Sequence, residues 1–293
     1  MHTCLRVGTD CSGIEAPIQA LRQLKIVHSH VFSSDIDPYV IQSIKANYDP
    51  RIIYGDITKR DAIRVPDIDL YVAGFPCQPF SMAGDRGGFA DKRGNVFWSC
   101  LDVIKTKQPT YFILENVKAL LWHDKGNTWK TIWDSLQLKN YTVKWKVLNT
   151  RDYGIPQNRE RIFIVGKKNG DFEWPEPTEM DDIRDYIDHT DTKRKEWGRK
   201  SSLKRVSPDA VFVDVDFLHY TNYPMAHKVS PCVLARPSSL WCIPYHRYAT
   251  CKEMFNLQGF DSFKQVVSNS QMKKQIGNSM SVNVLVAILN ELL

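Results

Sequence analysis

The chain has 293 residues, of which 43% are hydrophobic, and a formal net charge of +6 at pH 7. This length and apolar content are enough to bury a full core, in one large domain or in a large and a small one. The sequence has no apolar run of membrane-spanning length, no signal-peptide pattern and no C-x-x-C pair among its seven cysteines, which predicts an intracellular protein without a membrane partner, a disulfide framework or a metal cluster.

The first predicted unit is a strand, a glycine turn and a helix. Leu5–Thr9 is typical of a short strand, and apolar residues recur at helical spacing from Ile14 to Leu24. The turn between them, Asp10–Ala16, contains the single glycine Gly13. Such a turn places backbone N–H groups at a helix start, so it predicts a cradle for a small polar ligand, although one glycine is a weak match to a dinucleotide motif.

Acidic residues follow the next two predicted strands. Val27–Ser34 leads into Asp35 and Asp37, and Arg51–Tyr54 is followed closely by Asp56. An acid about 20 residues beyond the first glycine turn often binds the hydroxyls of a ribose. Asp37 precedes a proline and a helical pattern, which predicts a helix N-cap. Asp35 is therefore the better candidate for the ribose.

A fourth predicted strand, Asp69–Ala73, presents a cysteine in the loop that follows it. Pro76 and Pro79 restrict the backbone on either side of Cys77, so the thiol is held in a stiff turn. Residues 82–95 contain four glycines among charges, which is typical of a lid over a site. Cys77 is a candidate nucleophile, the alternative being an inert thiol that ends a strand.

Strands and helices continue to alternate as far as residue 166. The predicted elements are the helix Val96–Lys107, the strand Thr110–Leu114, the helix Asn127–Leu138 and the strands Tyr141–Asn149 and Arg161–Gly166. This alternation predicts an open α/β sheet of the Rossmann type, whose ligands bind at the carboxyl ends of its strands.

The composition changes at residue 171. A proline-containing linker and a highly charged stretch follow, and residues 206–245 suggest short strands and loops. Thr250–Leu257 predicts a short capped helix, and the chain ends in an apolar helix that runs from residue 275 to 293. We therefore predict a catalytic and cofactor-binding domain of residues 1–171, completed by the C-terminal helix 271–293, and a smaller target-recognition domain of residues 172–270.

Four ordered motifs resemble those of the DNA cytosine-5 methyltransferase family. They are Gly74–Ser81, Glu115–Val117, Gln157–Arg161 and Gln275–Ser279, and the resemblance covers most of the chain except residues 172–228. It implies a Rossmann-like methyltransferase sheet, and a monomer that methylates carbon 5 of a cytosine in a specific sequence of double-stranded DNA. S-adenosylmethionine is the implied cofactor.

The resemblance also implies the catalytic residues. Cys77 is the nucleophile that adds to carbon 6 of the cytosine, and Glu115 lies against ring nitrogen 3 and the exocyclic amine. Arg161 holds the carbonyl oxygen of the base, and Arg159 positions the loop or a phosphate. The alternative for both arginines is an exposed strand edge. Chemistry on a base within a duplex further implies base flipping.

By the same resemblance, Ser12 and Gly13 cradle the methionine end of the cofactor, Asp35 binds its ribose and Asp56 its adenine amine. The full set of implied cofactor-binding residues is Cys11, Ser12, Gly13, Ile14, Asp35, Ile36, Asp56, Ile57, Gly74, Pro76, Asn278 and Ser279. The sequence departs from the family pattern at the first motif, where Cys11 replaces an aromatic residue and Glu15 replaces a second glycine. It also has Ile36 where the family has an aromatic residue after the ribose-binding acid.

Two other functions remain open from the sequence alone. A transfer-RNA methyltransferase of the related branch typically carries Cys-Phe-Thr, which this sequence lacks. A catalytically silent DNA-binding relative has no chemical reason to retain Cys77, Glu115 and Arg161 together. Recognition of the target sequence is predicted within residues 172–245, where a basic run is consistent either with phosphate contacts or with a solvated face.

Overall fold

The structure is a computed structural model that describes residues 4–76, 96–192, 206–207, 209–216, 228–236 and 239–293. The chain divides into two compact units. The sheet unit comprises Met1–Leu148, Glu160–Pro175 and Leu285–Leu293, and the second unit comprises Asn149–Arg159 and Glu176–Val284. The chain therefore passes between the units after residues 148, 159, 175 and 284.

The sheet unit contains a seven-stranded sheet of order β3-β2-β1-β4-β5-β7-β6. Its strands are β1 (Leu5–Asp10), β2 (His28–Ser34), β3 (Ile52–Tyr54), β4 (Leu70–Ala73), β5 (Tyr111–Val117), β6 (Tyr141–Asn149) and β7 (Glu160–Lys168). The strands from β3 to β5 run parallel, and β7 runs antiparallel to β5. The chain moves outward from β1 to β3 and returns to β4 on the other side of β1. Ligands of open α/β sheets bind at such a reversal, beyond the carboxyl ends of β1 and β4.

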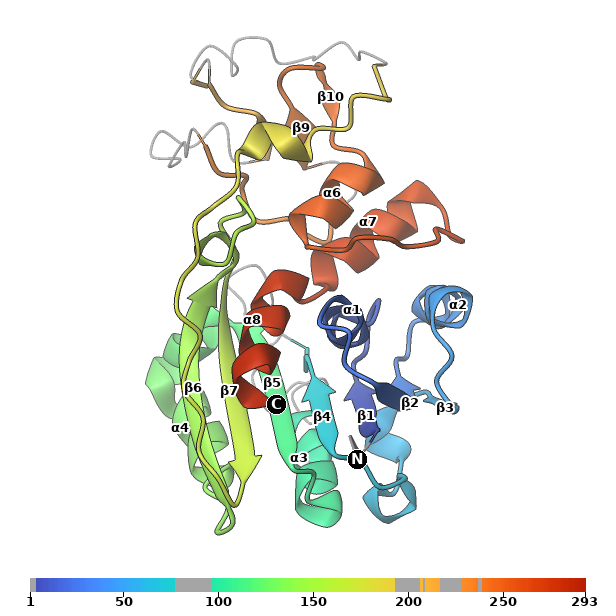
Figure 1. Cartoon of the computed structure of the whole chain (residues 1–293), viewed down its shortest axis with the longest axis vertical. Coiled ribbons are helices and arrows are strands. Elements are labelled where there is room, and N and C mark those ends of the chain that lie inside the picture. The colour runs from blue at the N-terminus through green and yellow to red at the C-terminus, as the bar shows by residue number, and fades with distance from the viewer. Residues whose placement is uncertain (1–3, 77–95, 193–205, 208, 217–227, 237–238) are drawn as a thin grey trace. The chain divides into compact units, whose positions relative to one another are not determined.

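Helices cover both faces of this sheet (Figure 1). They are α1 (Ala16–Gln23), α2 (Pro38–Asn47), α3 (Val96–Lys107), α4 (Asn127–Ser135) and α8 (Val282–Leu292). Side chains of α3 and α4 form one buried core with alternate strand residues, among them Phe32, Tyr71 and Phe112. In Figure 1, α1 and α8 lie over the opposite face. No helix within the described ranges has both the length and the apolar content needed to cross a membrane.

Two strand glycines are required by the core beneath α3 and α4. A Cβ atom on Gly8 would lie 2.2 Å from the ring of Phe32, and one on Gly166 would lie 2.0 Å from the ring of Phe112. Carbon atoms cannot approach this closely in a packed interior, so any side chain at either position would displace an aromatic ring.

The second unit combines a small antiparallel sheet with helices. Its strands are β8 (Phe212–Asp214), β9 (Leu240–Cys242) and β10 (Arg247–Tyr248), in the order β10-β9-β8, and its helices are α6 (Cys251–Leu257) and α7 (Asn269–Asn278). Thr250 and Glu253 form a capping box at the start of α6, as the sequence predicted. Glu253 also pairs with Arg247 in the interior, with Nη1 and Oε2 2.8 Å apart, and this pair ties β10 to α6.

The prediction of one continuous C-terminal helix is wrong. The chain forms α7, which ends at Asn278, and then α8, which begins at Val282. Ser279 between them is extended, with φ −68° and ψ 154°. The guanidinium of Arg159 donates hydrogen bonds to carbonyl groups at the end of α7. The apolar run could not reveal this break, because Arg159 lies in a distant part of the chain.

The predicted α/β fold is confirmed, and the strands and helices as far as β7 lie close to their predicted positions. The compact units, however, divide the chain differently from the predicted domains. Residues 149–159 and 271–284 belong with residues 176–270 in the second unit. Hydrophobic periodicity along the chain does not report this grouping, because it depends on contacts between distant residues such as Gln157 and Leu257.

Candidate active site

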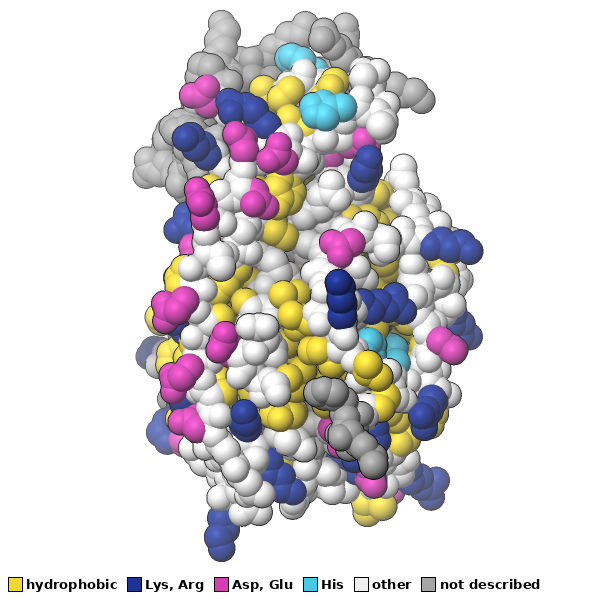
Figure 2. All heavy atoms as spheres, in the orientation of Figure 1, with side chains coloured by type: hydrophobic (Ala, Val, Ile, Leu, Met, Phe, Trp, Pro, Cys, Tyr) yellow, Lys and Arg dark blue, Asp and Glu magenta, His cyan; other side chains and the backbone are white. Residues whose placement is uncertain are grey.

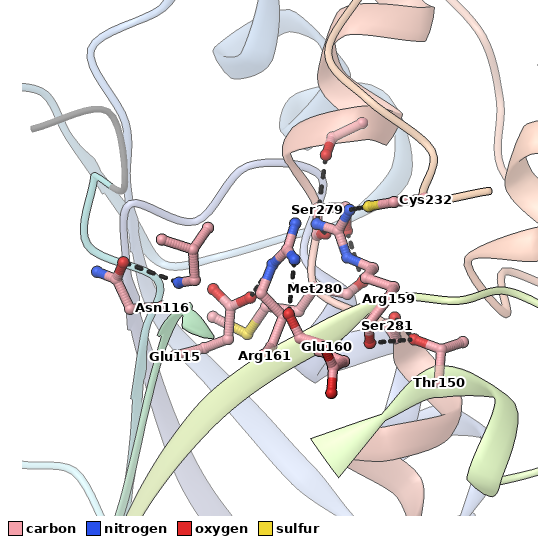
Figure 3. Close-up of polar contacts among 12 residues, drawn as sticks. Glu115, Asn116, Thr150, Arg159, Glu160, Arg161, Cys232, Ser279, Met280 and Ser281 are labelled. Carbon is pink, nitrogen blue, oxygen red and sulfur yellow. Dashed lines mark hydrogen bonds and ion pairs between the residues drawn. The ribbon is translucent and has the colours of Figure 1, made fainter. Parts of the chain in front are cut away.

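Strands β5 and β7 bring an acidic and a basic side chain together. Glu115 on β5 and Arg161 on β7 lie diagonally across the antiparallel pair, because Val117 is the register partner of Arg161. Nε of Arg161 lies 3.2 Å from Oε1 of Glu115, and their side chains are 17% and 11% exposed (Figure 3). Nη1 of Arg161 also donates to the backbone carbonyl of Glu160 at 2.8 Å. The structure thus joins two of the predicted catalytic residues and orients both.

Asn116, which had no predicted role of its own, ties β5 to the loop that leads to Cys77. Its Nδ2 donates to the carbonyl oxygen of Phe75 at 3.2 Å, and both residues are buried. Phe75 lies at the end of β4 between Gly74 and Pro76. Cys77 itself lies outside the described residues, as does the glycine-rich run after it. The backbone is therefore anchored two residues before the predicted nucleophile.

Arg159 lies in the interior of the second unit and is 2% exposed. Its guanidinium donates to Sγ of Cys232 at 3.3 Å and to the carbonyl of Val233 at 3.0 Å. It also donates to the carbonyls of Gly277 and Ser279, at 3.3 and 2.6 Å (Figure 3). A cation at a helix C-terminus stabilises the last carbonyl groups, so Arg159 holds the end of α7. Its two predicted roles, positioning the loop or a phosphate, stay predictions.

Gln157, the first residue of the same motif, also points inward. Its Oε1 accepts from the backbone N–H of Val233 at 2.8 Å, and its Nε2 donates to the carbonyl of Leu257 at 2.7 Å. The motif Gln157–Arg161 therefore contains side chains with different tasks. Gln157 and Arg159 organise the second unit, and Arg161 joins Glu115 in the sheet unit.

The turn after β1 is fastened to the end of β2. The backbone N–H of Ser12 donates to the carbonyl of Ser34 at 2.9 Å, and the N–H of Ser34 donates to Oγ of Ser12 at 2.8 Å. The N–H of Gly13 donates to Oδ2 of Asp35 at 3.1 Å. Gly13 has φ +53°, and a Cβ atom there would meet nothing within 4 Å. The turn therefore borders open space beside a carboxylate, at the reversal between β1 and β4.

Asp35 and Ile36 continue this edge. Burial raises the pKa of the Asp35 carboxyl, while hydrogen bonds from the backbone N–H groups of Asp37 and Gly13 act in the opposite direction. Ile36 is 75% exposed, which is unusual for an aliphatic side chain of this size. An acceptor for hydroxyl groups thus stands next to an exposed apolar side chain.

Asp56 and Ile57 lie beyond β3. Asp56 caps the short 3-10 helix η1 (Ile57–Lys59), because its Oδ1 accepts from the backbone N–H of Thr58 at 3.0 Å and from its hydroxyl at 2.7 Å. These hydrogen bonds lower the pKa of Asp56. Ile57 is 6% exposed and belongs to the core of the sheet. Of the two isoleucines predicted to flank an adenine ring, Ile36 is thus exposed and Ile57 is buried.

Two other predicted members of the turn face the protein. Ile14 is fully buried, and its carbonyl accepts from the hydroxyl of Tyr48 at 3.0 Å. Cys11 packs against the core cluster, and burial raises the pKa of its thiol well above the ordinary value. These residues support the turn from beneath.

A buried ion pair beside the turn had no counterpart in the sequence analysis. Arg60 donates to both carboxylate oxygens of Asp10, at 2.9 and 2.5 Å, and the hydroxyl of Tyr71 donates to Oδ2 at 2.7 Å. The guanidinium also lies 4.8 Å from the ring centre of Tyr54. An acid at the end of the first strand was the available signal, but its partner lies 50 residues away in the sequence.

Asn278 and Ser279 were predicted to close the far side of the cofactor, and both belong to the second unit. Asn278 is the last residue of α7 and is exposed, whereas Ser279 is buried and its hydroxyl donates to the carbonyl of Met280 at 3.0 Å. Their contact with a cofactor stays a prediction.

Charge is distributed without a dominant basic cluster on the face that Figure 2 shows. There, Lys and Arg side chains of the described residues are interspersed with Asp and Glu side chains. The basic run at residues 193–205 lies outside the described ranges. Within the part of the chain that the structure describes, no three His, Cys, Asp or Glu side chains are grouped so that they could hold a metal ion.

Comparison with known proteins points to one family. Residues 10–232 and 234–293 match the C-5 cytosine-specific DNA methylase family. Type II methyltransferase M.HaeII of Haemophilus aegyptius is 39% identical over 268 residues, which cover 88% of this chain and 84% of that protein. Type II methyltransferase M.NlaX of Neisseria lactamica is 39% identical over 279 residues, which cover 89% of this chain and 88% of that protein.

Solved structures share the fold along nearly the whole chain. The methyltransferase EhMeth of Entamoeba histolytica superimposes with a TM-score of 0.72 at 18% identity, covering 98% of this chain and 97% of that one. The S. pombe Dnmt2 methyltransferase superimposes with a TM-score of 0.65 at 21% identity, covering 97% of each chain. At such identities the likeness supports the architecture alone.

Proposed function

This chain belongs to the C-5 cytosine-specific DNA methylase family, and we propose that Cys77, Glu115 and Arg161 carry the chemistry of its reaction. The reaction transfers a methyl group from S-adenosylmethionine to carbon 5 of a cytosine in DNA. The observation that carries the proposal is the pairing of Glu115 with Arg161 on β5 and β7, next to the strand that leads to Cys77.

In the proposed reaction, Cys77 makes carbon 5 of the cytosine reactive. Its thiolate forms a bond to carbon 6, and the resulting enamine attacks an electrophilic methyl group through carbon 5. Transfer of the carbon 5 proton to water then breaks the bond between carbon 6 and sulfur, which releases the thiolate and restores the aromatic ring. Because the ring atoms of a stacked base are inaccessible, the target nucleotide leaves the duplex first.

Glu115 and Arg161 act on the polar edge of the same base. The carboxyl group of Glu115 hydrogen-bonds ring nitrogen 3 and the exocyclic amine, where charge changes when the thiolate adds. Arg161 donates to the carbonyl oxygen of the cytosine and holds Glu115 in place through their contact at 3.2 Å. Asn116 anchors the backbone at Phe75, two residues before the nucleophile.

The turn after β1 fits the implied cofactor. Gly13 borders open space, Asp35 presents a carboxylate fixed by backbone N–H groups, and Ile36 exposes an apolar side chain. We assign the methionine end to Ser12 and Gly13, the ribose to Asp35 and one face of the adenine ring to Ile36. When bound, S-adenosylmethionine supplies the electrophilic methyl group. Asp56, at the end of β3, is assigned to the adenine amine.

Substitution of the two acids tests this assignment. Asp35→Ala and Asp56→Ala should each weaken S-adenosylmethionine binding by about 1–3 kcal/mol, because a buried polar group of the ligand loses its partner. Isothermal titration calorimetry measures the change. The matched control is Asp61→Ala, since Asp61 caps the next 3-10 turn through the N–H of Ile63 in the way that Asp56 caps η1. Unchanged affinity in both variants would place the adenosine elsewhere.

We assign recognition of the target sequence to residues 172–245, which belong to the second unit from residue 176 onward. The chemical motifs lie outside this stretch, and the match to Type II methyltransferases supports methylation of one defined sequence as part of restriction–modification. Contacts to phosphate fix the register of a protein on DNA, and contacts to base edges specify the sequence. Hydrogen bonds of the buried side chains of Arg159 and Gln157 hold the interior of the second unit together. Such an interior supports side chains that contact base edges.

An alanine scan of residues 172–245 should separate two classes of side chain. Loss of a phosphate contact should weaken binding to all sequences alike and reduce the salt dependence, by about one unit of slope for each contact. Loss of a base contact should cost about 1–3 kcal/mol at one position and relax the site there. Binding titrations at several salt concentrations detect the first class, and bisulfite sequencing of methylated random-sequence DNA detects the second.

The control for the scan is Lys130→Ala on α4, which removes an exposed charge paired with Asp134 in the sheet unit. It should leave the methylated sequence unchanged. If every variant of residues 172–245 also retains the wild-type sequence, specificity lies outside this stretch, most plainly in residues 82–95.

A further inference from the structure

A buried carboxylate lies directly beneath the cofactor turn and has no part in the reaction described above. Glu15 is the N-cap residue of α1, is fully buried, and replaces the second glycine of the family pattern. Its backbone is left-handed, with φ 60° and ψ 47°, which is unfavourable for a residue with a side chain. A glycine would adopt this conformation without strain, so the left-handed backbone alone favours glycine over glutamate here.

The carboxylate of Glu15 joins the ends of β1 and β2. Its Oε1 accepts from the hydroxyl of Thr9 at 2.7 Å and from the hydroxyl of Ser33 at 2.6 Å. Nε2 of His30 lies 3.4 Å from the same oxygen and 3.0 Å from Oγ of Ser33. All these groups are buried, where a hydrogen bond to a carboxylate is stronger than in water.

This arrangement fixes the direction of the hydroxyl group of Ser12. A carboxylate only accepts, so the single proton of the Thr9 hydroxyl points to Glu15. Oγ of Ser12 lies 2.7 Å from Oγ1 of Thr9 and 3.0 Å from the carbonyl of Thr9, and both of these atoms can then only accept from it. The proton of Ser12 is therefore directed into the protein, and its lone pairs are left to accept, one of them from Ser34.

The same chain of hydrogen bonds reaches Asp35. Oγ of Ser12 accepts from the backbone N–H of Ser34, the residue before Asp35, and Gly13 donates to the Asp35 carboxylate. Loss of the Glu15 carboxylate would leave the Thr9 and Ser33 hydroxyls buried without this acceptor. Both would rotate toward other partners, and the orientation of Ser12 would no longer be set.

We propose that Glu15 is a positioning residue for S-adenosylmethionine, which acts through Thr9 and Ser12 to hold the turn and Asp35 in the binding geometry. This inference rests on the assignment of the cofactor to Ser12, Gly13 and Asp35.

Glu15→Gly and Glu15→Gln separate the carboxylate from the backbone. Glycine relieves the strain of the left-handed backbone but removes the carboxylate that accepts from Thr9 and Ser33. Cofactor affinity should therefore fall at least about tenfold, although the backbone is less strained. Glutamine keeps an oxygen for Thr9 and Ser33 and places its amide nitrogen at Oε2, which has no hydrogen-bond partner among the described residues. Its affinity should stay within about threefold of wild type.

Calorimetric titration with S-adenosylmethionine and with S-adenosylhomocysteine measures these affinities independently of turnover. Urea unfolding gives the stability of each variant. Asp69→Asn is the matched control, because Asp69 pairs with Arg6 at the opposite end of β1, with 2.7 Å between Oδ1 and Nη2. Asp69→Asn should lower stability and leave the affinity for S-adenosylmethionine unchanged. Glu15→Gly would give the same result if the role of Glu15 were purely structural.

Asp35→Ala distinguishes this inference from the assignment of the cofactor site. Wild-type affinity in Glu15→Gly, with weakened binding in Asp35→Ala, would overturn the role of Glu15 alone. Wild-type affinity in both would overturn the cofactor site and the inference with it. If Glu15→Gly does not fold, Thr9→Val breaks the same path at nearly constant shape, and wild-type affinity in that variant overturns the proposal.

Discussion

Replacement of Cys77 by alanine is expected to reduce methyl transfer to background and to abolish covalent capture of DNA that carries 5-fluorocytosine at the target. The fluorine at carbon 5 cannot leave as a proton does, so the adduct between the Cys77 sulfur and carbon 6 persists once the methyl group has been transferred. Denaturing gel electrophoresis of the protein with labelled DNA detects this adduct, and tritiated S-adenosylmethionine measures the transfer.

The control for Cys77→Ala is Cys4→Ala, which removes an exposed free thiol at the start of the chain. It should retain both the adduct and the activity, since its thiol lies before β1. Binding of DNA and cofactor by Cys77→Ala should remain measurable, which separates a lost nucleophile from a lost site. An adduct that persists in Cys77→Ala would show that another residue attacks the base.

Glu115→Gln should lower kcat about a hundredfold to ten-thousandfold, the usual effect of removing a positioned group that exchanges a proton or hydrogen bond in the transition state. The amide has nearly the same shape, so the affinity for DNA and the affinity for S-adenosylmethionine should change little. Arg161 loses the charge of its partner in this variant. Thermal unfolding must therefore accompany the rate measurement, which is best made in a single turnover.

A neighbouring carboxylate provides the comparison for Glu115→Gln. Glu160 lies on β7 beside Arg161, is 44% exposed at its side chain and pairs with Lys118 at 2.8 Å. An exposed pair of this kind contributes about 0–1 kcal/mol, so Glu160→Gln should leave stability and kcat close to wild type. If Glu115→Gln were as active as Glu160→Gln, the acidic group that assists the base would have to be sought elsewhere.

Strand and helix positions in the first half of the chain could be read from local patterns. Pro38 after Asp37 marks the start of α2, because a proline has no N–H to leave unpaired in the first turn. The carboxylate of Asp37 accepts from the backbone N–H of Tyr39. Short apolar runs separated by helical periodicity likewise determined the strands of the sheet. These signals are strong because the interactions that produce them join residues only a few positions apart.

The end of the chain illustrates the opposite case. The residues from 275 to 293 favour one helix by composition, yet the structure contains two. The guanidinium of Arg159, more than a hundred positions earlier, accounts for the difference by bonding the carbonyls of Gly277 and Ser279. A long-range hydrogen bond of this kind leaves no periodic trace in either segment.

The sequence by itself determined the class of enzyme, because the ordered motifs that contain Cys77, Glu115 and Arg161 resemble those of one family, to which the chain belongs. It also determined the α/β architecture, through periodicities that arise within single strands and helices. Only the tertiary structure decided which motif side chains pair with each other in the sheet unit and which organise the second unit. Arg159 and Arg161 are two positions apart, yet one clamps the second unit and the other pairs with Glu115, since each direction is set by partners distant in the chain. In the sequence, Glu15 is only a departure from the family pattern. The structure shows that Thr9, Ser33 and His30 surround its carboxylate.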